Sequence, residues 1–170
     1  MVWTAIAMVK MIRKRCVVVF LLGGMACQSS GEKSVDSDSQ CNGLEVLCER
    51  RVDEVAFAGT HNSMSSTEDG WMFPNHDFNF ERQLDDGIRA LNIDTHWWND
   101  EAYLCHTYCD LGAMTLLEGF NRIGDWLADH PREVLIITLQ SAVDADNTMA
   151  VLESSSLNGL LYDYEMGTEW

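Results

Sequence analysis

Two histidines in this sequence stand shortly after apolar segments. His61 follows the segment 55–59, and His106 lies between two cysteines in the sequence CHTYC. Histidine exchanges protons near neutral pH, so two histidines at one site can act as a general base and a general acid, each contributing about 10²–10⁴ in rate. For His61 taken alone, a simple cap on the turn that follows is the alternative role.

Three side chains with amide or carboxylate oxygens accompany these histidines. Asn62 follows the first of them, while Asn92 and Asp94 lie on the polar face of the alternating segment 90–96, together with His96. Polar side chains on one strand face are costly to bury unless they are paired or bind something. Oxygen ligands suit hard cations such as calcium, so we expect Asn62, Asp94 and Asn92 to be the metal ligands of this protein.

Strands and helices that alternate along the chain must position these residues. We expect strands at 55–59, 90–96 and 134–139, a short strand or hairpin arm at 103–107, and helices at 81–87, 115–129 and 145–161. The segment 134–139 is continuously apolar, as in a strand that is buried on both faces. This order predicts an α/β fold with a parallel sheet, whose active site lies at the carboxyl ends of the strands.

The charge distribution restricts the partners and the location of the protein. Its formal net charge is -16 with a pI near 4.4, so we expect no nucleic-acid partner, because phosphate binding needs clustered cations. Residues 1–26 hold four basic residues and no acidic one, around an apolar segment too short to span a bilayer. They predict a signal peptide, and therefore export.

The residues after the signal peptide indicate how the exported chain is organised. Cys27 follows small residues, which predicts a lipid at this position that holds the protein on a membrane surface. The protein is then either a cell-envelope lipoprotein or secreted. Residues 27–40 are rich in Ser, Gly and Asp and predict a flexible tether, so that the globular domain spans 41–170.

Four cysteines remain in the globular domain, at positions 41, 48, 105 and 109. An even number in an exported chain predicts disulfides, and pairing 41 with 48 and 105 with 109 closes two short loops. Four residues of extended strand span about 13 Å, beyond disulfide reach, so the second bridge requires the chain to turn around His106. A zinc site built from these cysteines and His106 is the alternative.

Four motifs in order resemble the phosphatidylinositol-specific phospholipase C X-domain family, exported bacterial type. They are AFAGTHNSMSS, QLDDGIRALNIDTHW, YLCHTYCDLG and HPREVLIITLQ, and the resemblance covers residues 41–170. It implies a TIM-type (β/α)8 barrel of the phospholipase C-like phosphodiesterase kind. A complete barrel needs about 250 residues, so we expect only the N-terminal half of it in this chain, as a fragment.

The resemblance also implies a reaction and the residues that perform it. It implies a phosphoric diester hydrolase that cleaves a phospholipid or a related phosphodiester. His61 would be the general base that takes a proton from a hydroxyl beside the phosphodiester, and His106 the general acid for the leaving alcohol. A metal-dependent lyase or sphingomyelinase-type relative also pairs histidines on a barrel rim, and these residues do not separate the two.

A calcium cofactor follows from the same resemblance, with two departures. Calcium-dependent members have an asparagine where Asn62 stands and acids where Asn92 and Asp94 stand. Asn92 and Gln140 are neutral where these members carry glutamates, which lowers the charge of the site. The alternative function is therefore a catalytically inactive, lipid-anchored binding protein on the same fold.

Overall fold

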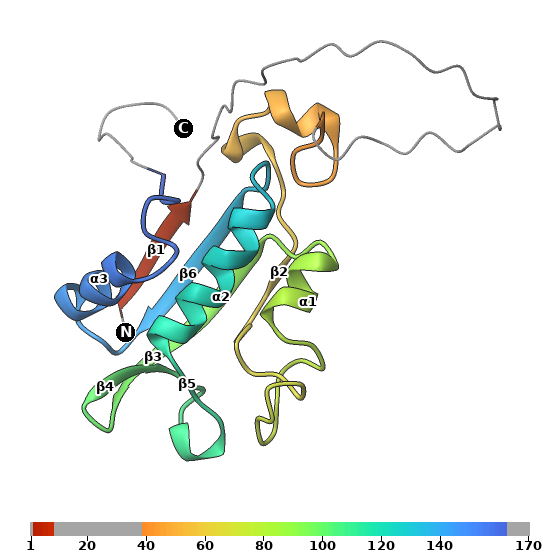
Figure 1. Cartoon of the computed structure of the whole chain (residues 1–170). Helices are drawn as coiled ribbons and strands as arrows, with labels where there is room; N and C mark the ends of the chain where they lie inside the picture. The colour runs from red at the N-terminus through yellow and green to blue at the C-terminus, as the bar shows by residue number, and fades with distance from the viewer. Residues whose placement is uncertain (1, 9–38, 163–170) are drawn as a thin grey trace, which may run out of the picture.

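A six-stranded mixed sheet forms the centre of the protein, whose computed structural model describes residues 2–8 and 39–162 (Figure 1). The strands are β1 (Val2–Met8), β2 (Gly59–Thr60), β3 (Ala90–Trp98), β4 (Glu101–Leu104), β5 (Met114–Thr115) and β6 (Leu135–Ser141). Their order is β1-β6-β3-β4-β5, with β2 beside β3. The pairs β2–β3 and β3–β6 are parallel, as predicted, whereas β1, β4 and β5 pair antiparallel with their neighbours.

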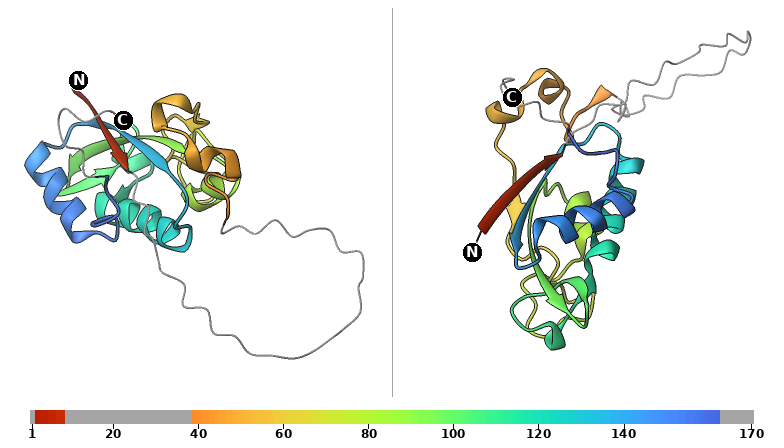
Figure 2. Two further views of the ribbon diagram at one scale, coloured as in Figure 1. Left: turned by 90° about the horizontal axis from the view of Figure 1, so that it is seen from above. Right: turned by 90° about the vertical axis from the view of Figure 1, so that its left-hand side faces the viewer.

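The helices gather on one face of this sheet (Figure 2). They are α1 (Phe80–Asp85), α2 (Leu116–Asp129) and α3 (Ala145–Ser154), with the short 3-10 turns η2 (Glu45–Glu49), η3 (Val52–Glu54) and η4 (Cys109–Leu111). Asn79, Thr115 and Asp144 cap the three α-helices by accepting a backbone N–H three residues on. Within the described ranges, no helix is both long and apolar enough to cross a membrane.

The predicted end of the last helix, at 161, is wrong. α3 ends at Ser154 because the serines there bond to backbone carbonyls of the preceding turn. The Ser154 hydroxyl donates to Val151 O at 2.8 Å, and the Ser155 hydroxyl donates to Leu152 O at 2.7 Å. The other predicted elements are present with shifted ends, and the expected strand at 55–59 is reduced to β2.

The core lies between the sheet and α2. Leu91, Ile93, Leu135, Ile137 and Leu139 of the sheet are each at most 2% exposed. They join the apolar stripe of α2, formed by Leu116, Phe120, Ile123, Trp126 and Leu127. On the opposite face of β6, the side chains of Ile136, Thr138 and Gln140 are only half-buried. The expectation that 134–139 is buried on both faces is therefore wrong.

The expected TIM-type barrel is also wrong, because the sheet is open and mixed. β1 and β5 end the strand order and do not pair with each other. After β3, Asn99 and Asp100 adopt left-handed conformations with φ of 49° and 63°. Two such residues make a tight hairpin, which returns the chain antiparallel as β4 where a barrel needs a helical crossover to a parallel strand.

Residues 39–58 cover the amino ends of the parallel strands, opposite to the ends where those strands finish (Figure 1). Cys41 and Cys48 form a disulfide there, and Asn42 is bonded to Val134 just before β6. Residues 2–8 of the predicted signal peptide form β1. The remainder of that segment and the tether up to residue 38 lie outside the described residues, so the signal peptide, the lipid on Cys27 and the tether stay predictions.

Candidate active site

His61 and Asn62 lie in the turn that follows β2. Asn62 adopts a left-handed conformation with φ of 53°, which asparagine tolerates better than most residues. Ser63 joins this turn to β3, because its backbone N–H donates to Asn92 O at 2.9 Å and its hydroxyl accepts the Asn92 N–H at 3.1 Å. The turn is thus fixed to β3 at the level of Asn92.

The side chain of Gln83, on α1, braces the same turn through hydrogen bonds, and the sequence did not predict this contact. The side chain is 5% exposed. Its amide nitrogen donates to Ser63 O at 2.9 Å and to Phe78 O at 2.8 Å. Its amide oxygen accepts the Thr60 hydroxyl at 2.8 Å. A polar residue among the apolar positions of a short helix is the one sequence signal that could have revealed it.

His76 is a second brace that the sequence did not reveal. Its Nε2 lies 2.7 Å from the backbone oxygen of His61. Ser65 O in turn accepts the backbone N–H groups of Asn75 and His76. These bonds fold the loop 61–79 back on itself, so the backbone that carries His61 is held although the His61 side chain is exposed.

His106 lies in a turn closed by the disulfide between Cys105 and Cys109, as the sequence predicted. The two Cα atoms are 5.0 Å apart. Thr107 is left-handed, with φ of 64°, and the Tyr108 N–H donates to His106 O at 2.7 Å. Because these sulfurs are bonded to each other, the structure favours the disulfides over the zinc site.

Three buried oxygens, one in the turn after β2 and two on β3, have no hydrogen-bond partner among the described residues. They are the Oδ1 atoms of Asn62, Asn92 and Asp94. Asn62 is 2% exposed and Asp94 is 4% exposed. Buried polar atoms are nearly always paired, and an unpaired one costs about 1–3 kcal/mol. Such a set of acceptors matches what a hard cation or a ligand N–H or O–H requires.

The donor set fits calcium in ligand type but supplies little charge. Asp94 is the one carboxylate among the three residues, and Gln140 stands beside it in the register of β3 and β6. Among the residues that the structure describes, no three His, Cys, Asp or Glu side chains cluster as metal ligands. A cation at this place would depend on the two asparagine oxygens.

Asp94 is electrostatically linked to the histidines of the site. Burial raises the pKa of its carboxyl, and positive charge on His106, His61 and His96 opposes that rise. The Cys105 N–H also donates to Asp94 O at 3.3 Å, which ties the disulfide turn to β3. The structure thus places Asp94 within electrostatic reach of both predicted histidines, and the bonds of Ser63 place the turn of Asn62 beside Asn92.

A pocket of about 240 Å³ opens beside His106. Its lining residues come from the loop 61–79 and from the disulfide turn with η4: Ser65, Trp71, Met72, Phe73, His106, Thr107, Tyr108, Leu111 and Gly112. This pocket was not predicted, since its two walls are far apart in the chain.

Comparison with known proteins finds one family and two relatives. Residues 47–168 match the profile of the family described as PI-PLC X 1. An "Uncharacterized secreted protein" of Arthroderma benhamiae is 33% identical over 140 residues, which cover 81% of this chain and 31% of that protein. The "PI-PLC X domain-containing protein 1" of the same organism is 34% identical over 111 residues, which cover 64% and 36%.

The chain spans about a third of the length of these curated relatives. Both come from one fungus, so the expected bacterial type gains no support from them. No solved structure matches the chain.

Proposed function

The chain belongs to the PI-PLC X domain family, and from this premise we propose that it is a phospholipase C-like phosphoric diester hydrolase. Its substrate is a phospholipid or a related phosphodiester. The observation that carries the proposal is the group of three unpaired buried oxygens, Asn62, Asn92 and Asp94, beside two exposed histidines. A phosphodiester needs proton transfer at two oxygens, which the histidines suit. It also needs positive charge near its own negative charge, which a cation held by the three oxygens would supply.

The two histidines divide the proton transfers between them. His61 takes the proton of an attacking hydroxyl, and that oxygen forms a bond to phosphorus. The bond from phosphorus to the leaving oxygen breaks, and His106 gives its proton to that oxygen. The braced turn at His61 and the disulfide turn at His106 support this assignment, because both fix the backbone of an exposed side chain.

Calcium is the cofactor that the donor atoms favour, with Asn62, Asn92 and Asp94 as its ligands. A bound calcium ion would partly neutralise the phosphodiester oxygens. Asp94 must be ionised to serve as a ligand, and positive charge on the nearby histidines favours that form.

Export belongs to the same proposal. Two disulfides in the described residues suit an oxidising compartment, and one relative is named a secreted protein. A lipid on Cys27 would hold the domain on a membrane surface, near phospholipid substrates. Cys27 itself lies outside the described residues.

A catalytically inactive binding protein is the second candidate. It is favoured by the neutral side chains of Asn92 and Gln140, which stand on adjacent strands and leave Asp94 as the single charge among the candidate ligands. Such a protein would bind the phosphodiester without turnover.

The test is hydrolysis of a panel of phosphodiesters by the full-length protein, with and without calcium. We expect His61→Ala and His106→Ala each to lower kcat by about 100-fold or more. His130→Gln is the matched control, because His130 ends α2 at the opposite end of the sheet. Full turnover in both alanine variants would overturn the proposal, and calorimetric binding of inositol phosphates without any turnover would favour the second candidate.

A further inference from the structure

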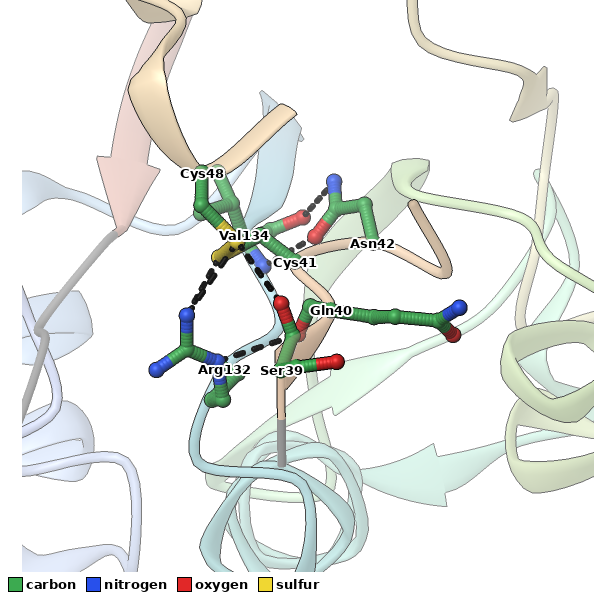
Figure 3. The surroundings of a disulfide bond; sticks show 7 residues. All are labelled: Ser39, Gln40, Cys41, Asn42, Cys48, Arg132 and Val134. Atoms are coloured by element: carbon green, nitrogen blue, oxygen red, sulfur yellow. Dashed lines mark hydrogen bonds between the residues drawn. A yellow bond between two sulfur atoms is a disulfide. The ribbon is translucent and has the colours of Figure 1, made fainter. Parts of the chain in front are cut away.

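The disulfide between Cys41 and Cys48 has a cation beside its sulfur atoms (Figure 3). The Nη2 group of Arg132 donates to Cys48 Sγ at 3.1 Å and to Cys41 Sγ at 3.4 Å. The guanidinium is held in this place because its Nε also donates to Gln40 O at 3.1 Å. Arginine keeps its proton throughout the pH range in which proteins fold, so a full positive charge stands beside both sulfurs.

The second disulfide allows a comparison within the same molecule. Its two Cα atoms are 5.0 Å apart, as they are in the first bridge. In each bridge one cysteine is buried, Cys41 or Cys105, and the other is half-buried, Cys48 or Cys109. Within the part of the chain that the structure describes, however, no side chain donates to the sulfurs of the second bridge. The charge of Arg132 therefore distinguishes the first bridge from the second.

A positive charge beside a disulfide favours thiol–disulfide exchange. In this reaction a thiolate attacks one sulfur and the other sulfur leaves as a thiolate, so the leaving sulfur becomes negatively charged. A neighbouring cation stabilises that thiolate and makes it a better leaving group. It also offsets the repulsion of an anionic reagent by a protein whose formal net charge is -16. Glu45 and Glu49 lie close along the chain but are exposed, so that water and salt screen their charges.

The segment around the first bridge stays attached to the sheet when the bridge opens. Asn42 donates to Val134 O at 3.1 Å and accepts the Val134 N–H at 2.6 Å. The backbones of Cys41 and Leu44 also bond to each other, at 3.2 and 3.1 Å. None of these bonds involves a sulfur atom. The two cysteines therefore remain close to Arg132 after exchange, and the bridge can form again.

We propose that Cys48 is a site where a small external thiol becomes joined to the protein by exchange with the bridge between Cys41 and Cys48. The thiolate of the reagent forms a bond to Cys48 Sγ, the bond between the two protein sulfurs breaks, and its electron pair stays on Cys41 Sγ. Arg132 stabilises the resulting thiolate. Attack falls on Cys48 because Cys41 is only 6% exposed, whereas Cys48 is half-buried. Attack by the Cys41 thiolate on the new bond releases the reagent and restores the bridge.

The size of the reagent and the place of the site follow from the same observations. A half-buried sulfur admits a small thiol more readily than the active site of a folded redox protein. The segment 39–58 covers the amino ends of the parallel strands, opposite to the ends that lead to the candidate active site (Figure 1). The proposal therefore does not rest on the proposed function, and it requires no turnover to be tested.

The test uses reduced glutathione as the thiol and the folded, full-length protein. Free cysteines are trapped with iodoacetamide at successive times, and the modified peptides are identified by mass spectrometry. We expect a glutathione adduct at Cys48 together with an alkylated Cys41, formed about tenfold faster or more than any product at Cys105 or Cys109.

Variants of Arg132 isolate the contribution of its charge. Arg132→Gln should slow the reaction at Cys48 about threefold or more, and Arg132→Lys should restore most of the rate, because lysine keeps the positive charge. Arg50→Gln is the matched control, since Arg50 is exposed in the same segment and its charge is not bonded to the sulfurs. The bridge between Cys105 and Cys109 reports on the fold of each variant, and its rate should stay unchanged.

Several results would overturn the proposal. Glutathione could leave both bridges intact, or open the second bridge first. The rate at Cys48 could stay the same or rise in Arg132→Gln, or fall equally in Arg50→Gln. An adduct with the dithiol of a thioredoxin-class protein, but none with glutathione, would contradict a small thiol as the reagent.

Discussion

Each end of the sheet has a disulfide that closes a short loop, but the two ends differ in whether their polar groups are hydrogen-bonded. At the amino ends of the strands, Arg132 donates to Gln40 O at 3.1 Å and to Cys48 Sγ at 3.1 Å (Figure 3). Asn42 uses its amide nitrogen toward Val134 O at 3.1 Å and its amide oxygen toward Val134 N at 2.6 Å. In the turn after β2 and on β3, by contrast, three oxygens are buried with no partner in the described residues.

This difference separates a part of the molecule that contributes to stability from a part that is prepared for a ligand. Paired polar groups fasten residues 39–58 to the sheet and leave those side chains little to offer a ligand. Unpaired buried oxygens destabilise the free protein, and a ligand that pairs them recovers that cost. Each end also has a disulfide. The bridge between Cys41 and Cys48 lies in the segment 39–58, and the bridge between Cys105 and Cys109 closes the turn of His106.

Gln83→Leu should have the largest effect among the variants that test this difference, because it should lower both stability and turnover. The change leaves Ser63 O and Phe78 O without their donor, so we expect a loss of about 1–3 kcal/mol in the free energy of unfolding. Because the turn of His61 loses its brace, kcat should also fall by about tenfold or more. Asn42→Ala is the matched variant at the other end, and it should lower stability with kcat unchanged, as measured by denaturant unfolding and hydrolysis.

Removing the disulfides one at a time sharpens the comparison. Each closes a short loop, so each pair of Cys→Ser changes should cost about 2 kcal/mol of stability. Loss of the 105–109 bridge should also reduce turnover several-fold, since His106 is no longer held. Loss of the 41–48 bridge should leave turnover intact at temperatures where the variant is folded. Equal losses of turnover on removal of the two bridges would contradict the assignment of one end of the sheet to stability and the other to ligand binding.

Asp94→Asn tests whether the buried Asp94 carboxyl, whose Oδ1 has no hydrogen-bond partner among the described residues, destabilises the protein in the absence of a ligand. Burial raises the pKa of Asp94, so the folded state holds its proton more tightly than the unfolded state does. The stability that this group contributes is therefore present at low pH and is lost as the pH rises through the raised pKa. The variant should be more stable than the parent at neutral pH, and calcium should raise the Tm of the parent only.

Glu81→Gln should have the smallest effect on stability. The stability that Glu81 contributes is lost as the pH falls, whereas that of Asp94 is lost as the pH rises. Burial alone would raise the pKa of Glu81, but hydrogen bonds and charge from Arg122 outweigh it and hold the pKa below its ordinary value. The contribution of this pair to stability is present above the ordinary carboxyl pKa and is lost as the pH falls through the lowered one. Glu81→Gln should flatten the acid end of the stability profile slightly, since the carboxyl is partly exposed.

The sequence predicted those features that follow from apolar periodicity. The stripe of α2 and the parallel strands β3 and β6 were predicted because burial imposes a repeat on the residues. The residues of the candidate site were found through motifs, and the turn at His106 through disulfide geometry.

Features that depend on individual side-chain hydrogen bonds, or on a turn without a disulfide, were not located by the sequence. The hairpin at Asn99 and Asp100 turns β4 back along β3, and the sequence indicated a hairpin arm there without identifying these two turn residues. Gln83 and His76 bond to backbone oxygens, which every residue type has, so the sequence does not identify their partners. The walls of the pocket meet only in the folded chain.

The most direct test of the central claim is turnover of one phosphodiester by the full-length protein, by His61→Ala, by His106→Ala and by the double variant. Two histidines that act in one proton-transfer cycle are strongly non-additive. We predict that each single change lowers kcat by about 100-fold or more and that the double change lowers it little further. Full turnover in the single variants, or losses that simply multiply in the double variant, would contradict a site built on this pair.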